Sequence, residues 1–144
     1  MAHVVLEAKL DRTPLARRVE VDSSGTGDWH VGQGMDTRAA TTLTAAGYDP
    51  TRHRAQQFDR AWFERHDAIL AMDAENKRDV LRDAPDDESR SRILMLREFD
   101  PNADGDLDVP DPWHGGQRGF DDVLAMIERS TDGLLAALKE ALGG

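Results

Sequence analysis

A continuous apolar run, Ala68-Ile69-Leu70-Ala71-Met72, is followed directly by Asp73. Apolar residues in unbroken succession are typical of a strand that is buried on both faces, as the strands of parallel sheets are. Asp73 is a favourable N-cap, so we expect a helix to begin after it and to reach about Ala84. The strand pattern returns at Ile93 to Leu96. A buried strand, a helix and a second buried strand together predict an α/β fold built on a parallel sheet.

The segments on either side of this unit continue the alternation of helices and strands. We expect a short helix from Ala2 to Leu10 and a brief strand at Val19-Glu20-Val21, which a loop of small residues ends. A further helix is expected after a cap at Asp36, with Gly47 as its C-terminal stop. We expect an interruption of the closing helix near Asp132-Gly133, and a ligand site at the carboxyl ends of the strands. The apolar stripe of that closing helix comprises Phe120, Val123, Leu124, Ile127, Leu134, Leu135 and Leu138.

Composition and charge narrow the class of protein. The length suits a single domain over residues 1–144. Asp and Glu number 28 against 18 Lys and Arg, and this net charge of -10 repels phosphate backbones and anionic lipid, so we expect neither nucleic acid nor membrane as a partner. No apolar run is long enough to span a membrane and no secretory signal is visible, so a cytoplasmic location is expected. The chain contains no cysteine, which excludes a disulfide, a thiolate metal site or a cysteine nucleophile within these residues.

Two loops carry residues suited to binding or chemistry. The small residues in Ser23 to Gly32 let the backbone approach a ligand and Trp29 offers an aromatic wall, although such a loop is also an ordinary turn. The segment Asp100 to Asp111 places side-chain oxygens at relative positions 1, 3, 5, 9 and 12 and a glycine at position 6, as EF-hand calcium loops do. Its last residue is Asp instead of Glu, and Pro110 and Pro112 oppose the exit helix. An acidic, turn-rich loop is therefore the favoured interpretation, and a calcium-binding loop is the alternative.

Five segments carry a more specific signal when they are taken in order along the chain. They are Val19 to His30, Tyr48-Asp49, His53 to Phe58, Ile69 to Asp73 and Leu107 to Gly115. Together they resemble a low-molecular-weight protein tyrosine phosphatase of the actinobacterial type, and the Asp-Val-x-Asp-Pro-aromatic sequence of the last segment is the most specific part. The resemblance implies a flavodoxin-like three-layer sandwich with a four-stranded parallel sheet in the order 2-1-3-4. It also implies hydrolysis of phosphotyrosine, on a protein or a small aryl phosphate, without a metal or organic cofactor.

The resemblance implies roles for individual side chains. In that family a cysteine thiolate in a Cys-x5-Arg-Ser phosphate loop attacks phosphorus, and an aspartic acid protonates the departing phenolate. The aspartic acid corresponds to Asp111. Ser23 and His53 correspond to residues that support the phosphate loop by hydrogen bonding. The residues that correspond to the lining of the phosphotyrosine cleft are Trp29, Trp113 and His114.

The chain departs from the family at the phosphate loop, because it has no cysteine. The alignment that needs no gap sets Met1-Ala2 on the Met-Ala that follows Cys-Arg-Ser-Pro in the family, which leaves the first strand and the phosphate loop without a counterpart. We therefore expect an N-terminally incomplete domain that is inactive as a phosphatase. The alternative is a non-catalytic pseudophosphatase or phospho-ligand-binding protein. Without that central strand, Val19 to Val21 and Ala68 to Met72 either pair directly or flank a slot that something else fills.

Overall fold

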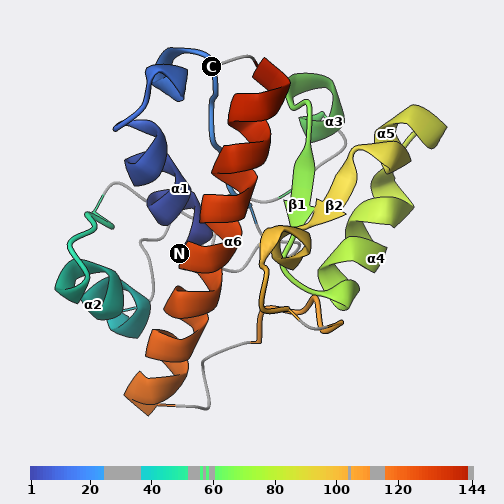
Figure 1. The fold of residues 1–144 in the computed structure, drawn as a ribbon. Coiled ribbons are helices and arrows are strands. Elements are labelled where there is room, and N and C mark those ends of the chain that lie inside the picture. Colours follow the sequence, from blue (N-terminus) through green and yellow to red (C-terminus); the bar gives the residue numbers. More distant parts are fainter. Residues whose placement is uncertain are drawn as a thin grey trace.

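The computed structural model describes residues 1–24, 37–51, 56, 58, 61–103, 105–110 and 116–142. Helices surround a small sheet, and the long helix α6 crosses the molecule between α1 and the strands (Figure 1). In chain order the elements are α1 (Ala2–Leu10), η1 (Pro14–Arg17), α2 (Thr37–Ala45), α3 (Trp62–Arg65), β1 (Ile69–Ala71), α4 (Ala74–Asp83), α5 (Asp87–Ser91), β2 (Ile93–Met95), η2 (Leu96–Phe99) and α6 (Gly116–Leu142). In these parts of the chain no helix combines the length and the apolar character that crossing a membrane requires.

The sheet consists of one parallel strand pair in the described residues. β1 and β2 run in register, with Ile69 opposite Ile93, and α4 and α5 form the crossover between them. The side chain of Asp73 accepts a 2.7 Å hydrogen bond from the backbone N–H of Asn76, which is the geometry of an N-cap. The predicted strands, the cap and the helix that reaches about Ala84 are therefore confirmed, although each strand is a residue shorter at one or both ends than its apolar run.

Each face of the sheet is covered by helices. Successive side chains of a strand point to opposite faces. Leu70 accordingly packs against a core cluster formed mainly by α1, η1 and α6, whereas its neighbour Ile69 packs against a second cluster. That second cluster joins α3, α4 and β2, with Phe63 almost fully buried. The α/β class and the coverage of both faces are as predicted.

The N-terminal helices also form where the sequence predicts them. α1 has the predicted bounds and buries Val5, Leu6 and Leu10. α2 ends shortly before Gly47, whose φ of 93° lies in the left-handed region that a residue after a helix end commonly adopts. The predicted cap of α2, Asp36, lies outside the described residues.

The strand predicted at Val19-Glu20-Val21 is wrong, because this segment has no regular structure. A strand exists only as part of a ladder with a partner strand. In the described part of the chain β1 pairs with β2, and residues 19–21 have no such partner. Val19 and Val21 are still half-buried against the first core cluster. The segment thus keeps its apolar packing without its hydrogen-bonded ladder, and direct pairing with β1 does not occur.

The interruption expected near Asp132-Gly133 is also wrong, because α6 continues to Leu142. Gly133 serves a different purpose. A Cβ atom added at this position would overlap the backbone carbonyl oxygen of Phe99 in η2. The glycine therefore allows α6 to pack directly on the backbone of η2, and the helix passes through it unbroken.

Candidate active site

Most of the predicted site residues lie outside the described residues. This holds for the candidate acid Asp111 and for Trp29, His53, Trp113 and His114. The structure does describe Ser23 and the segment that leads into Asp111, residues 105–110. The contacts of these two segments are therefore what the structure describes of the expected site.

The segment before Asp111 is fixed at the carboxyl end of β1. The backbone N–H of Val109 donates a 2.7 Å hydrogen bond to the carbonyl oxygen of Met72, the first residue after the strand. One carboxylate oxygen of Asp108 accepts a 2.9 Å bond from the backbone N–H of Ala74, the first residue of α4. A carboxylate is favourable at this end of a helix, where unpaired N–H groups and the helix dipole are positive. These contacts place residues 108 and 109 beside the carboxyl end of β1, and the location of the site there stays a prediction.

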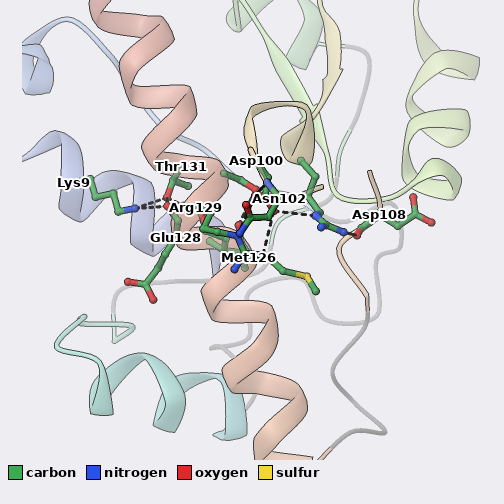
Figure 2. Close-up of polar contacts among 11 residues, drawn as sticks. Lys9, Asp100, Asn102, Asp108, Met126, Glu128, Arg129 and Thr131 are labelled. Carbon is green, nitrogen blue, oxygen red and sulfur yellow. Dashed lines mark hydrogen bonds and ion pairs between the residues drawn. The ribbon is translucent and has the colours of Figure 1, made fainter. Parts of the chain in front are cut away.

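Arg97 ties the same segment to the interior. Its Nη1 donates a 2.8 Å hydrogen bond to the carbonyl oxygen of Asp108, and its Nε lies 3.3 Å from a carboxylate oxygen of Asp100. Both side chains of this ion pair are buried. Arg129 from α6 reaches the same carboxylate, with its Nε 3.1 Å from Oδ1 (Figure 2). A chain of contacts thus runs from α6 through Asp100 and Arg97 to Asp108.

The charge of Asp100 is stabilised by this arrangement. Burial acts to raise the pKa of Asp100, but hydrogen bonds from Arg129, from the backbone N–H of Asn102 and from Arg97 outweigh it, so the pKa lies below the usual range of an aspartate. Both oxygens of the carboxylate are already occupied by protein donors. This carboxylate is the first position of the calcium-like pattern, so its contacts favour the acidic, turn-rich interpretation of the loop. Gly105, with φ 87°, forms part of that turn.

Two histidines hold the segment that contains Ser23. The hydroxyl of Ser23 lies 2.8 Å from Nδ1 of His3, whose Nε2 is 3.1 Å from a carboxylate oxygen of Glu7. The preceding residue, Asp22, lies 2.8 Å from Nε2 of His66. In the described residues the Ser23 side chain therefore contacts α1, and its predicted support of a phosphate loop stays a prediction.

A hollow of about 360 Å³ lies beside this segment, between α1, η1 and residues 19–22. Its lining contains none of the predicted site residues, and its charged side chains are all acidic. Such a lining repels a phosphate group. The hollow is therefore a poor candidate for the phosphate site. Its acidic side chains are Glu7, Asp11, Glu20 and Asp22.

Sequence reasoning missed the residues that hold these segments. His3, His66 and Arg97 follow no pattern that marks them as site residues. The spacing of Arg97 and Asp100, three residues apart, was the one available signal, because this spacing allows an ion pair in a helical turn.

Comparison with known proteins identifies the family. The family model "Low molecular weight phosphotyrosine protein phosphatase" matches residues 1–142. The chain belongs to this family. The low molecular weight protein-tyrosine-phosphatase of Streptomyces coelicolor is 43% identical over 145 residues, which cover 100% of this chain and 88% of the relative. Low molecular weight protein-tyrosine phosphatase A of Mycobacterium tuberculosis is 41% identical over 135 residues, covering 93% of this chain and 80% of the relative.

The phosphatase fold is confirmed in three dimensions. A crystal structure of the protein tyrosine phosphatase of Entamoeba histolytica, with Hepes in its active site, superposes with a TM-score of 0.90 at 27% identity. The match covers 97% of this chain and 88% of that one. The predicted resemblance and the flavodoxin-like α/β class are thus correct.

Proposed function

We propose that this chain is the scaffold and acid-bearing part of a phosphatase that hydrolyses phosphotyrosine on a protein or a small aryl phosphate. The observation that carries the proposal is the 43% identity to the Streptomyces coelicolor phosphatase along the whole chain. The anchored segment before Asp111 supports it, because a general acid must be held within reach of the leaving oxygen.

In the proposed reaction Asp111 gives its proton to the phenolate oxygen as the bond between phosphorus and that oxygen breaks. A thiolate takes the phosphoryl group, and water later releases it as phosphate. Ser23 and His53 support the phosphate loop by hydrogen bonding. No metal or organic cofactor takes part. The aromatic ring of the substrate lies in a slot whose residues are Trp29, Trp113 and His114.

The 144 residues contain no cysteine, so they supply no such thiolate. Removal of a covalent nucleophile costs a hydrolase on the order of 10⁶-fold in rate. We therefore expect these residues alone to be inactive. The same observation favours a second candidate, a pseudophosphatase that binds a phosphotyrosine ligand without cleaving it. The cytoplasmic location stays a prediction.

The decisive experiment uses protein purified from its native source, so that it is tested as the cell makes it. We expect its intact mass to exceed that of the 144 residues and a phosphotyrosine peptide to be hydrolysed. Asp111→Asn, introduced in the gene, should lower kcat/KM by about 10²-fold or more. Asp87→Asn, an exposed site on α5, serves as the control and should leave the rate unchanged. A species that begins at Met1 as the sole product, with no hydrolysis, would overturn the enzyme proposal in favour of the binding protein.

A further inference from the structure

We propose that Arg97 and Asp108 are positioning residues for the general acid: they fix the segment before Asp111 to the end of β1 and the start of α4. The inference rests on the proposed function for the role of Asp111. Its structural part, the anchoring of this segment by Arg97, rests on contacts in the described residues alone.

Three hydrogen bonds to other elements and the burial of one apolar side chain hold Asp108 and Val109 in place. The carbonyl oxygen of Asp108 accepts from Arg97 at 2.8 Å, and its carboxylate accepts from Ala74 at 2.9 Å. The backbone N–H of Val109 donates to Met72 at 2.7 Å. The Val109 side chain is buried in the first core cluster. Backbone and side chain of this dipeptide are therefore both fixed.

The anchor lies close to Asp111 in the sequence. Two residues of fully extended chain span at most about 7 Å, so an anchor at Val109 is close enough in the chain to act on the residue two positions later. Pro110 stands between them, and its ring fixes φ near -65°. Loss of the anchor would therefore release the residue that carries the proton.

Arg97 could instead act only as a counter-ion for Asp100, and Arg129 distinguishes these two roles. Both arginines contact the Asp100 carboxylate. Arg97 also binds the Asp108 carbonyl. The hydrogen bonds found for Arg129 go to the carboxylate of Asp100 (Figure 2). In either single variant Asp100 retains one arginine partner. Arg97→Met and Arg129→Met are therefore matched variants that differ in the contact to the segment.

The first test measures amide hydrogen exchange in the 144-residue chain. In Arg97→Met we expect the Val109 amide to exchange at least about tenfold faster relative to the Ile127 amide of α6, because a hydrogen bond from a charged donor to this segment is lost. In Arg129→Met the ratio of the two rates should stay the same. Asp108→Ala, at an exposed position, should act like Arg97→Met, and Asp108→Asn should not, because its amide oxygen still accepts from Ala74. An equal increase of the Val109 exchange rate in the two arginine variants would overturn the proposal that Arg97 anchors the segment. If Arg97→Met does not fold, Asp108→Ala decides instead, and an unchanged Val109 exchange rate in that variant would overturn the proposal.

The second test measures kcat/KM on two aryl phosphates in protein from the native source. A proton donor matters more for phenyl phosphate than for 4-nitrophenyl phosphate, because nitrophenolate leaves readily without a proton. We expect Arg97→Met to lower kcat/KM for phenyl phosphate about tenfold more than for 4-nitrophenyl phosphate. In a chain that already carries Asp111→Asn, Arg97→Met should not change the ratio of kcat/KM for the two substrates. Arg129→Met should not change the ratio of the two substrates. Equal losses on both substrates would make Arg97 merely structural. If Asp111→Asn itself shows no selectivity, the acid assignment fails, and the exchange experiment still decides the anchor.

Discussion

Replacement of Asp100 by Asn removes the charge at the centre of the Arg97–Asp100–Arg129 network while it preserves the shape of the side chain. Arg97 is buried and would lose its buried counter-ion, although the exposed carboxylate of Asp106 at 3.9 Å and the bond to the Asp108 carbonyl remain. Breaking a buried ion pair on one side costs about 3–5 kcal/mol, because a buried charge is left without compensation. We expect Asp100→Asn to lose about 3 kcal/mol of unfolding free energy at pH 7, the lower end, since Asn still accepts hydrogen bonds.

The matched control is the pair Asp87 and Arg90 on α5, which has the same residue types and also lies three residues apart. Its carboxylate is 99% exposed, so Asp87→Asn should cost no more than about 0.5 kcal/mol. Urea denaturation of the wild-type chain, Asp100→Asn and Asp87→Asn, monitored by tryptophan fluorescence, gives the loss of unfolding free energy in each variant. A cost for Asp100→Asn as small as that for Asp87→Asn would refute the reasoning that burial makes this network stabilising.

The sign of the pH dependence follows from the direction of the pKa shift. The folded-state pKa of Asp100 lies below the usual aspartate pKa. The ionised carboxylate therefore stabilises the folded state fully when the pH is above that usual aspartate pKa. This contribution is lost as the pH falls through the folded-state pKa. The stability difference between the wild-type chain and Asp100→Asn should therefore be constant near neutrality and shrink in acid. A difference that grows as the pH falls would contradict the assignment.

Two further predictions concern α6 and the single tyrosine. Gly133→Ala should lower the free energy of unfolding by about 2 kcal/mol in urea denaturation. The reason is that the energetic cost of the overlap with the Phe99 carbonyl exceeds the gain of about 1 kcal/mol in helix propensity. A stabilised variant would show that α6 moves away from η2 easily. Tyr48 donates a 3.0 Å hydrogen bond to Glu128, and burial together with this carboxylate raises the pKa of Tyr48 to about 12. The phenolate absorbance should therefore titrate near 12 and at a lower pH in Glu128→Gln, whereas a midpoint near 10 would contradict the contact.

The fold was predictable from the sequence where local patterns and tertiary packing agree. The apolar run before Asp73 and the cap at Asp73 describe a unit whose strand, turn and helix all form. The strand prediction for Val19 to Val21 is wrong for a physical reason. β-branched residues favour an extended chain, but a strand also requires a partner strand, and propensity carries no information about that partner. The predicted helix interruption at Gly133 is wrong because this glycine serves a tertiary contact, the close approach of the Phe99 backbone, which a local sequence pattern does not reveal.

The candidate site was predictable only as far as side-chain types specify chemistry. The assignments of Asp111 and of the aromatic residues come from the family resemblance, because a proton donor and an aromatic slot require those residue types, and they stay predictions. The contacts that fix the preceding segment are different in kind. Val109 donates through its backbone N–H, and Asp108 accepts from Arg97 through its backbone carbonyl, groups that nearly every residue possesses.

This difference between side-chain and backbone contacts explains why the proposed role of Arg97 could not be predicted from the sequence. Arg97 reaches a backbone atom, so the identity of residue 108 does not reveal the contact, and the arginine itself resembles an ordinary partner of Asp100. The Asp108 side chain contributes an acceptor for the Ala74 N–H, so substitutions that keep an acceptor there should be tolerated, whereas loss of the Arg97 guanidinium should not be. Lys at position 97 provides the sharpest comparison, because one ammonium group cannot bind the Asp100 carboxylate and the Asp108 carbonyl with the fixed fork of a guanidinium. We therefore expect Arg97→Lys to keep most of the stability and to lose much of the Val109 protection, a combination that a purely electrostatic role of Arg97 does not produce.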